Sequence, residues 1–524
     1  MEVNGIMALA FLSFLSPTTW VLIITTFVLF AIYSIWPYMV FKKMGVPGPM
    51  PIPFFGNLLH YRQGRAQLDE KCHERYGNIW GIYEGRIPML MVTDLEIVKI
   101  VLVKEFYTHF TNRRNLKMNG ILDEALSVVE DDTWKRIRSI LSPTFSTGKL
   151  KEMVPIIKYY TNALVEHLRK RESQTLEIKK IFGSFSMDVI TSAAFSTQVD
   201  SLNNENDPFI HNVNKLMKFS FFSPISLLIF LFPVTIPVLR FFNFHMLSSS
   251  VLHFFNTNLQ RMKKARMEGK HLDRVDFFQM MIDVQISETV KNEQGAAIPY
   301  KSLSDNEIQA QAMIFILAGT DTTANTLSYV AYNLAVHPDI QRKLQNEIDK
   351  AFPDKSELTY EGVMGLPYLD MVISETLRMF PIAARAHRVC KKSTELGGLH
   401  VPRGMIIGVP LFALQRDPSV WPEPEEFRPE RFTKEAKEGR NPYAYLPFGA
   451  GPRNCIGMRF ALMHMKMGLV ALLREFNIRT TPETEIPLEI GSGVLLSPKN
   501  PIKLKFERRE HHVKFEPHEG EESE

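Results

Sequence analysis

One cysteine near the C-terminus lies in a setting that suits metal chemistry. Cys455 falls within the ten residues from Phe448 to Gly457, whose glycines and proline predict a tight loop. The apolar pattern from Met458 to Arg474 predicts a helix directly after this loop. Backbone N–H groups and the helix dipole at such a position favour a thiolate over a thiol. We therefore interpret Cys455 as the single axial thiolate ligand of a haem iron.

The residues around Cys455 suit the same role. Phe448 can shield the sulfur from water, Arg453 offers a cation to an anionic edge, and Gly457 lets the backbone approach a flat group. The alternative for a lone cysteine is a buried structural residue in a glycine-rich turn. The complete pattern Phe-Gly-x-Gly-x-Arg-x-Cys-x-Gly is far more specific, and it resembles the haem-thiolate signature of the cytochrome P450 monooxygenases. The resemblance implies haem b as the cofactor.

A second motif lies inside a predicted helix from Glu307 to His337. The run Ala318-Gly319-Thr320-Asp321-Thr322-Thr323 is locally unfavourable for a helix. Its threonines can bond back to the preceding turn, so a tolerated kink is one interpretation. The other is a groove for dioxygen over the iron, with Thr322 donating a hydrogen bond and Asp321 relaying protons. The run resembles the family's Ala/Gly-Gly-x-Asp/Glu-Thr-Thr motif.

Two further groups of residues match the family. Trp134 and Arg138 share one helix face at a spacing of four, which in isolation indicates only a tryptophan packed on an arginine stem. The resemblance implies instead that they hold a haem propionate, together with Arg113 and Arg388. It also implies a buried structural network behind the haem. Without the resemblance, an acid and a base spaced by three residues would be interpreted as a pair on a helix surface. The residues of this network are Glu375, Arg378 and Arg431.

The nearest resemblance is to family three, subfamily A, of the vertebrate microsomal cytochromes P450. Ser127, Ile382 and Ala383 match substrate-contacting positions, and Leu317 and Ala318 adjoin the oxygen motif. Several positions depart from the subfamily. Leu317 replaces a phenylalanine, and Thr320-Asp321 replaces Tyr-Glu. Three further positions of the expected pocket differ from the residues usual in the subfamily: Ala384, Ala386 and His387.

Composition bounds the class of protein. The chain has 524 residues, which alone suggests about three domains, but from Phe54 to Phe506 no linker or repeat interrupts it. Early strand-like runs (79–83, 89–93) and long helical stretches predict one domain, mainly α with a small β portion. A net charge of +4 does not suggest nucleic-acid binding. Three separated cysteines exclude a disulfide framework and a zinc cluster, and suit a reducing compartment.

The N-terminus predicts a membrane anchor. No charged residue occurs from Val3 to Phe41, and the run from Trp20 to Trp36 can cross a bilayer. A cleaved signal peptide would need preceding basic residues and a small-residue cleavage site. Lys42 and Lys43 follow the span, so the remainder is expected in the cytosol. We expect an anchor at 1–41, a basic, proline-rich, semi-rigid tether at 42–53, the catalytic domain at 54–506, and a charged disordered tail at 507–524.

A second apolar stretch, 219–244, has three prolines that would break a membrane span. We expect short helices forming a lid that dips into the bilayer surface and admits lipophilic substrates; core packing is the alternative.

The resemblance spans the chain from the anchor to about Phe506 and implies oxygen activation at an endoplasmic reticulum membrane. No nucleotide fingerprint follows a strand, so electrons must come from outside. The family's donor is a membrane-bound NADPH-dependent diflavin reductase, with cytochrome b5 as an accessory. We expect this partner to bind a basic patch made of Lys135, Arg136, Arg138 and Lys466. The rival functions are a same-fold isomerase of peroxide substrates, a non-catalytic haem sensor or electron carrier, and a membrane scaffold.

Overall fold

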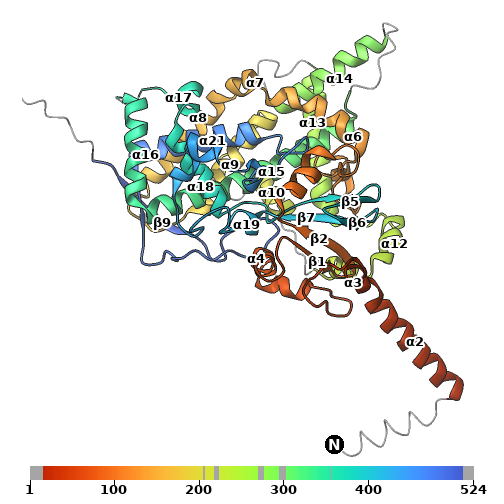
Figure 1. Cartoon of the computed structure of the whole chain (residues 1–524). Coiled ribbons are helices and arrows are strands. Elements are labelled where there is room, and N and C mark those ends of the chain that lie inside the picture. The colour runs from red at the N-terminus through yellow and green to blue at the C-terminus, as the bar shows by residue number, and fades with distance from the viewer. Residues whose placement is uncertain are drawn as a thin grey trace, which may run out of the picture.

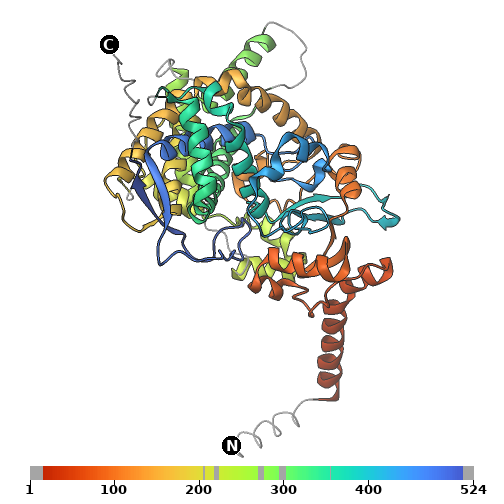
Figure 2. The same cartoon turned by 60° about the vertical axis from the view of Figure 1, so that its left-hand side comes forward.

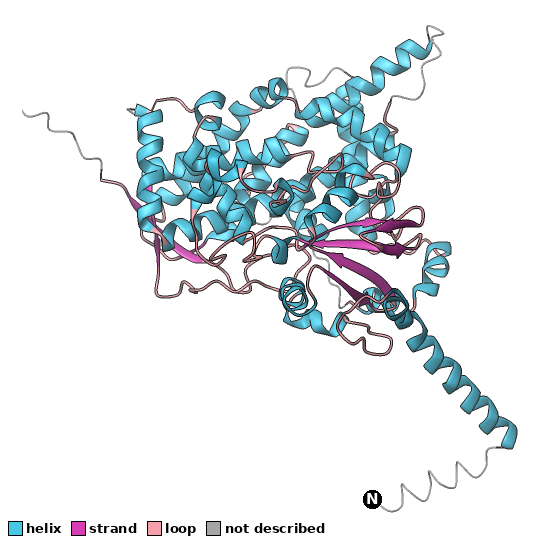
Figure 3. Cartoon of the chain, viewed as in Figure 1, coloured by secondary structure: helices cyan, strands magenta, loops and turns pink. Residues whose placement is uncertain are grey.

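The computed structural model describes residues 16–204, 207–217, 223–268, 276–293, 302–353 and 356–510. Most of the catalytic body is helical, and one helix, α2 (Pro17–Ile35), stands away from it in both views (Figures 1 and 2). Strands gather in a larger sheet near the base of α2 and a smaller one on the other side of the molecule (Figure 3). The predicted fold class, mainly α with a small β portion, is confirmed.

The first part of the chain builds the larger sheet and the approach to it. The sheet has the order β1-β2-β7-β4, in which β1 and β2 form an antiparallel hairpin and β2 pairs with β7 in parallel. The predicted strands at 79–83 and 89–93 correspond to β1 and β2. The bounds are α3 (Met39–Met44), α4 (Arg65–Tyr76), β1 (Ile79–Glu84), β2 (Ile87–Val92), β4 (Arg385–Val389) and β7 (Ile406–Pro410), with the hairpin β5 (Thr394–Leu396) and β6 (Leu399–Val401) beside them.

Helices α5 to α10 and α13 to α21 form the larger, helical part of the body. Their bounds are α5 (Leu95–Lys99), the short π-helix η3 (Ile100–Lys104), α6 (Asp131–Leu141), α7 (Thr147–Glu152), α8 (Val154–Arg169), α9 (Ile178–Phe195), α10 (Pro208–Met217), α13 (Ser249–Met267), α14 (Phe277–Glu293), α15 (Asp305–Val336), α16 (Pro338–Ala351), α17 (Tyr360–Met364), α18 (Pro367–Met379), α19 (Leu411–Leu414), α20 (Lys434–Glu438) and α21 (Met458–Glu475). The smaller sheet has the order β3-β9-β8, from β3 (Leu176–Glu177), β8 (Phe476–Thr480) and β9 (Lys503–Arg508). Short 3₁₀ turns connect several of these elements: η1 (Trp36–Tyr38), η2 (Leu58–Gln63), η4 (Gly120–Glu124), η5 (Ser142–Phe145), η8 (Pro429–Phe432) and η9 (Pro442–Ala444).

Helix α15 runs through the centre of the body and carries the oxygen motif. Its first turn is closed by a capping box, in which the Ser304 hydroxyl accepts from the Glu307 N–H and the Glu307 carboxylate accepts from the Ser304 N–H. Helix α9 packs closely against α15 at Gly319. A Cβ atom there would lie 2.7 Å from Cγ1 of Ile190, so only glycine permits this approach.

The region predicted to be a tether is folded onto the body. Phe41 and Val46 are buried, and Pro47 accepts a backbone hydrogen bond from Gly81 of β1. A Cβ atom on Gly48 would lie 2.1 Å from the Gly81 carbonyl oxygen. The expected semi-rigid spacer is therefore wrong, because its first half, around Val46 to Gly48, packs against β1 of the larger sheet.

The C-terminal boundary also differs from the prediction. We expected disorder from residue 507, but β9 extends to Arg508, which pairs with Glu172 at 3.0 Å. Arg509 forms a two-pronged pair with Asp349. Backbone pairing with β8 and these ion pairs order the segment despite its polar composition. Residues 511–524 lie outside the described part of the chain.

The apolar stretch 219–244 is described from residue 223 onward. Its prolines divide it into α11 (Pro224–Leu231), the turn η6 (Pro233–Thr235) and α12 (Ile236–Phe241), with a bend of 105° between the two helical parts. Ile229 and Phe230 of α11 are buried, whereas Phe241 is 82% exposed. The short helices were predicted correctly, and the stretch divides into a packed half and an exposed half.

Candidate functional site

The loop before α21 is shaped by two glycines with left-handed backbone. Gly449 and Gly451 have φ of +71° and +72°, which side chains rarely tolerate. A Cβ atom on Gly451 would lie 1.9 Å from the carbonyl oxygen of Leu102 in η3. The loop closes through a 2.9 Å hydrogen bond from the Cys455 N–H to the Phe448 carbonyl. These constraints fix the sulfur at the start of α21, as the sequence indicated.

Cys455 faces an interior cavity of about 420 Å³. Burial raises the pKa of the Cys455 thiol, although the Gly457 N–H, Arg138 and Arg113 act to lower it. The N–H group at the helix start favours the thiolate, as expected, and burial opposes it. A bound metal cation supplies the missing charge, since coordination deprotonates a thiol.

Four arginines from distant parts of the chain meet beside this cavity. A hydrogen bond from the Val389 N–H to the Asn112 carbonyl brings the loop bearing Arg113 against β4, which carries Arg388. Arg113 donates to the Arg453 carbonyl at 3.4 Å, and Arg138 of α6 donates to the Asn454 side chain at 2.8 Å. None of the four lies within ion-pair distance of a carboxylate in the described part of the chain. The cluster therefore holds several positive charges with no carboxylate of the described chain beside them.

The electrostatics of this cluster require an anion. Burial lowers the pKa of all four arginines, and nearby arginines lower it further for Arg113, Arg388 and Arg453. The pKa of Arg453 falls to about 9. Moreover, Nε of Arg388, Nε of Arg453 and Nε1 of Trp134 are buried with no hydrogen-bond partner among the described residues. Buried donors are rarely left in this state.

These features fit the two propionates of a haem b group. Orphaned donors and uncompensated cations surround one side of the cavity, and the Cys455 sulfur faces it. At Gly457 a Cβ atom would come no nearer than 3.9 Å to Phe145, so protein atoms leave room beside the loop for a flat group. Phe448 lines the same cavity. The donor set and the thiol together suit iron bound through one sulfur.

The rest of the cavity wall is mainly apolar. Of the predicted substrate contacts, Ala318, Ile382 and Ala383 line the cavity. Ser127 and Leu317 are not among the described residues of this wall, so their contact with substrate stays a prediction. Sequence reasoning missed a set of large side chains that arrive from η5, α9, α14, α15, α19 and α21, because nothing local marks them. They are Phe145, Ile190, Phe277, Phe315, Leu411 and Phe460.

The departures noted in the pocket include one polar change. Ala386 and His387 both line the cavity, and Ala384 is buried beside it. Burial, together with Arg113, lowers the pKa of His387 to about 3. This histidine is therefore neutral at physiological pH, and it adds an uncharged imidazole to the wall of the cavity.

The side chains of Asp321 and Thr322, the two residues predicted to act in the oxygen motif, line different cavities. Thr322 lines the cavity that Cys455 faces, and its hydroxyl donates to the Ala318 carbonyl one turn earlier. Asp321 lines a different cavity, where its Oδ1 lies 3.4 Å from Nζ of Lys179. Thr322 therefore bonds back to the helix and lines the site, and its role toward dioxygen stays a prediction.

Comparison with known proteins decides the family. The sequence profile described as Cytochrome P450 matches residues 46–506. The chain belongs to the cytochrome P450 family. It is 49% identical over 503 residues to cytochrome P450 3A27 of Oncorhynchus mykiss, which covers 96% of each chain. It is 50% identical over 500 residues to cytochrome P450 3A9 of Rattus norvegicus (95% of this chain, 98% of the relative), and 50% identical over 493 residues to cytochrome P450 3A29 of Sus scrofa (94% and 97%).

Membership confirms the predicted subfamily resemblance and the class of enzyme. As a cytochrome P450 the chain is a haem-thiolate monooxygenase of the unspecific type, and its cofactor is haem b.

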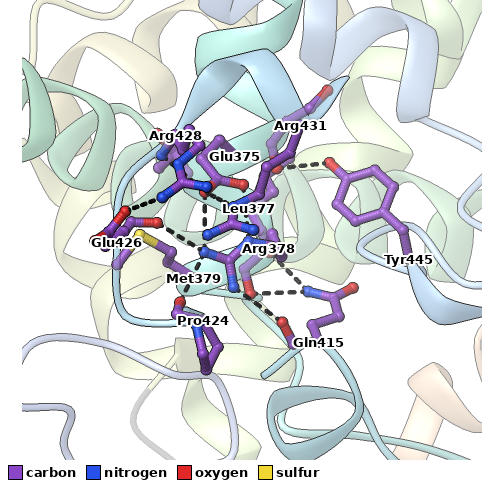
Figure 4. Close-up of polar contacts among 12 residues, drawn as sticks. Glu375, Leu377, Arg378, Met379, Gln415, Pro424, Glu426, Arg428, Arg431 and Tyr445 are labelled. Carbon is purple, nitrogen blue, oxygen red and sulfur yellow. Dashed lines mark hydrogen bonds and ion pairs between the residues drawn. The ribbon is translucent and has the colours of Figure 1, made fainter. Parts of the chain in front are cut away.

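Behind the Cys455 loop of this P450 lies a fully buried ionic network (Figure 4). Arg378 of α18 donates to both oxygens of Glu375, at 2.7 and 2.9 Å, and Arg431 donates to the same carboxylate at 3.2 Å. Arg378 also donates to the Gln415 carbonyl at 3.1 Å. Gln415 in turn accepts from the Leu446 N–H at 2.8 Å, two residues before the Cys loop. The network therefore ties α18 to the loop that presents the thiol.

The predicted basic patch does not form. Lys466 of α21 is buried, with Nζ 2.8 Å from Asp370 and 3.1 Å from the Met364 carbonyl. Arg136 pairs with Glu307 and donates to the Ser302 carbonyl at 2.8 Å. Because α21 is buried around most of its circumference, a lysine on it points inward and finds internal partners. Of the four predicted cations, Lys135 alone is both exposed and outside an ion pair in the described structure.

Proposed function

We propose that this P450 inserts one oxygen atom of O₂ into lipophilic small molecules, including steroids, drugs and other xenobiotics. The observation that carries the proposal is the composition of the cavity. Thr322 and the thiol of Cys455 share it with a wall of phenylalanine, leucine and isoleucine side chains. A site that only carried electrons would not need such a wall, whereas apolar substrates bind in cavities of this kind.

Each residue around the cofactor position has a distinct task in this proposal. When bound, haem b supplies the iron at which dioxygen is reduced and activated. Cys455 holds that iron through Sγ and pushes electron density toward it. Arg113, Arg388 and Arg453 neutralise the propionates, while Trp134 and Arg138 complete the donor set. The substrate is held against Ala318, Ile382 and Ala383, with Ser127 and Leu317 as further candidate contacts.

Proton handling is divided between two sides of α15. Thr322 holds its proton at Oγ1, on a hydrogen bond to the Ala318 carbonyl, and rotation about χ1 turns that hydroxyl into the cavity. The carboxylate of Asp321, the residue before Thr322, lines the other cavity beside Lys179. It exchanges protons with that cavity rather than with the substrate. We assign the two residues to the proton supply for O–O cleavage, Thr322 at the reaction centre and Asp321 on the solvent side.

The membrane attachment follows from two exposed apolar elements. The helical stretch Pro17–Met44 is long and apolar enough to cross a membrane. The end of this stretch is fixed to the body by two ring contacts. The ring centroids of Tyr33 and Phe232 lie 6.2 Å apart, and those of Phe30 and Phe54 lie 4.4 Å apart. The exposed face of α12 lies next to this junction in the chain. We propose a single anchor in the endoplasmic reticulum with the body in the cytosol, since Lys42 and Lys43 follow the span.

Electrons are proposed to come from NADPH through the membrane-bound diflavin reductase, with cytochrome b5 as an accessory donor. The support is indirect, from family membership and from the exposed Lys135 on α6, the helix that also carries Arg138. The rival isomerase needs no electron donor, which gives a direct way to separate the two functions.

The test reconstitutes the haem-loaded protein with reductase, NADPH and a probe steroid such as testosterone. Hydroxylated product that requires both NADPH and O₂ supports the proposal. Rearrangement of an added lipid hydroperoxide in the absence of reductase, with no NADPH-dependent product from steroids or lipophilic amines, would establish the isomerase instead. Reduction without any product would indicate an electron carrier.

A further inference from the structure

A second cavity lies on the far side of α15 from Cys455. It encloses about 550 Å³ between α9, α10, α15 and the segment 498–502. This volume is within the range of small-molecule sites, which is roughly 300–1,000 Å³. Successive helix residues are turned by about 100°, so positions 318, 319, 322 and 323 share one face of α15 while 320 and 321 share the opposite one. The single helix thereby forms a wall of both cavities.

One buried hydroxyl in this wall has no partner. Thr320 is 2% exposed, and its Oγ1 makes no hydrogen bond with any described residue. Other hydroxyls on α15 behave differently, since Thr322, Thr326 and Ser328 each donate to the carbonyl four residues earlier. The back-bonding that satisfies a helical threonine is therefore available on this helix, and Thr320 does not use it. Thr320 lines the second cavity, so a rotation of its side chain can present this hydroxyl to a polar group there.

The cavity also carries charged side chains of both signs. Lys179, Lys180 and Lys499 line it, against two carboxylates, Glu177 and Asp321. Lys180 lies 2.7 Å from Glu177, and Lys499 is paired with Glu489 outside the lining. The pair of Lys179 and Asp321 is longer, at 3.4 Å, than the 2.7–2.9 Å typical of charge-assisted hydrogen bonds. Lys179 is thus the cation that an incoming anion can most readily recruit.

Apolar side chains complete the wall. Met187 of α9, Ile210 of α10, and Pro501 and Ile502 of the C-terminal segment give the cavity a hydrocarbon surface beside its charged groups. A small inorganic anion would leave this surface uncovered, and a neutral hydrocarbon would leave the Thr320 hydroxyl without a hydrogen-bond partner. The lining matches a molecule with an anionic head and a compact apolar body.

We propose that this cavity is a second binding site for an amphipathic anion, such as a fatty carboxylate or a steroid sulfate. The head group binds Nζ of Lys179 and Oγ1 of Thr320, and the apolar body packs on Met187, Ile210 and Pro501. Because the head group competes with Asp321 for Lys179, binding there releases the carboxylate that adjoins Thr322. This consequence rests on the proposed monooxygenase function, whereas the binding itself does not.

The binding experiment uses the haem-loaded full chain with an azole inhibitor saturating the iron, so that the Cys455 cavity is blocked. A fluorescent carboxylate, 11-(dansylamino)undecanoate, is then titrated, with dodecanoate and dehydroepiandrosterone sulfate as competitors that separate the two head groups. Dodecanol, which lacks the charge, serves as the neutral comparison. Saturable binding of one equivalent, displaced by at least one of the two anions and not by dodecanol, is expected.

Three variants decide where the probe binds. Lys179→Met and Thr320→Val should each weaken binding, the first at least tenfold and the second at least threefold. Asp321→Asn should tighten it, because it removes the competitor for Lys179. Lys158→Met, which alters an exposed lysine paired with Glu357 elsewhere, is the matched control and should change nothing.

Two results would overturn the site. The first is the absence of saturable binding while the azole is bound, which would leave this cavity to solvent alone. The second is a Lys179→Met affinity within threefold of the parent protein. Neither result depends on turnover, so failure of this site is distinguishable from failure of the proposed function. If the site exists, dodecanoate should also change the product formed per NADPH in the parent protein and not in Lys179→Met.

Discussion

Asp321 and Thr322 are consecutive residues whose side chains line different cavities on opposite sides of α15. Thr322 shares its cavity with Cys455, and Asp321 shares the other with Lys179. In the proposed function, a proton relayed by Asp321 passes from one side of the helix to the other. The arrangement gives the two residues separable effects on turnover.

Replacing Thr322 with alanine should uncouple electron use from product formation. The substitution removes the hydroxyl and leaves the Cys455 loop and the arginine cluster intact, so haem content should persist. Product per NADPH should fall severalfold while peroxide release rises. The measurement is the ratio of product, peroxide and NADPH in the reconstituted system. Unchanged coupling, with Thr322→Ser as the conservative control, would assign the proton supply to Asp321 or to water.

The arginine cluster predicts opposite effects of one substitution on two forms of the protein. Arg388→Met should weaken haem retention, because a propionate loses its cation. In haem-free protein the same change should raise stability, by roughly 1–4 kcal/mol, because a buried and uncompensated charge is removed. Haem transfer to apomyoglobin and thermal unfolding of the haem-free form measure the two effects. Destabilisation of both forms would show that Arg388 is held by partners other than the haem.

Features of the fold and the site were predictable from the sequence where neighbouring residues determine them. The glycine-rich loop at Cys455 and the helix after it were predicted because two left-handed glycines and an unbroken apolar run act through neighbouring residues. The proline breaks in 224–241 are local in the same way. Lys466 was misplaced because α21 is buried around most of its circumference, and such a helix has no periodic pattern to say which side faces water.

The second cavity had no local signal at all. The helical period turns Asp321 and Thr322 to different sides of α15, but only the packing of α9 and α10 against that helix forms a cavity on the Asp321 side. Lys179, the partner of Asp321, lies far away in the sequence. The arginine cluster was named only through family resemblance, since its members come from four separate stretches: the loop bearing Arg113, α6, β4 and the Cys loop.

Glu375 is predicted to be essential for folding rather than for chemistry. Glu375→Gln leaves Arg378 and Arg431 buried with no counter-charge, which costs roughly 3–5 kcal/mol for a fully buried pair. We expect a lower unfolding temperature and largely haem-free protein. Glu489→Gln removes an exposed pair with Lys499 and should cost less than about 1 kcal/mol. Normal haem incorporation in Glu375→Gln would contradict the structural role.

His464 predicts a loss of stability in mild acid. Burial lowers its pKa to about 3, against about 6.5 for an ordinary histidine, and its Nε2 has no described partner. The unfolded chain therefore binds a proton below pH 6.5 that the folded protein refuses, so this contribution is complete above pH 6.5 and declines as pH falls toward 3. Between pH 7 and pH 5 the loss should reach about 2 kcal/mol.

Denaturant unfolding at the two pH values measures this term. His464→Asn should remove about that much of the difference, while His400→Asn, at an exposed position on β6, should leave the difference unchanged. An unaltered pH dependence in His464→Asn would show that the imidazole is protonated inside the folded protein.

The central claim is that Cys455 is the proximal ligand of the haem iron, and one spectrum tests it most directly. Dithionite-reduced protein saturated with carbon monoxide should show the strongly red-shifted Soret band of thiolate ligation. Cys455→Ser should abolish that band at equal haem content, while Cys72→Ser and Cys390→Ser, which alter buried thiols elsewhere, should retain it. A red-shifted band that survives Cys455→Ser would contradict the account.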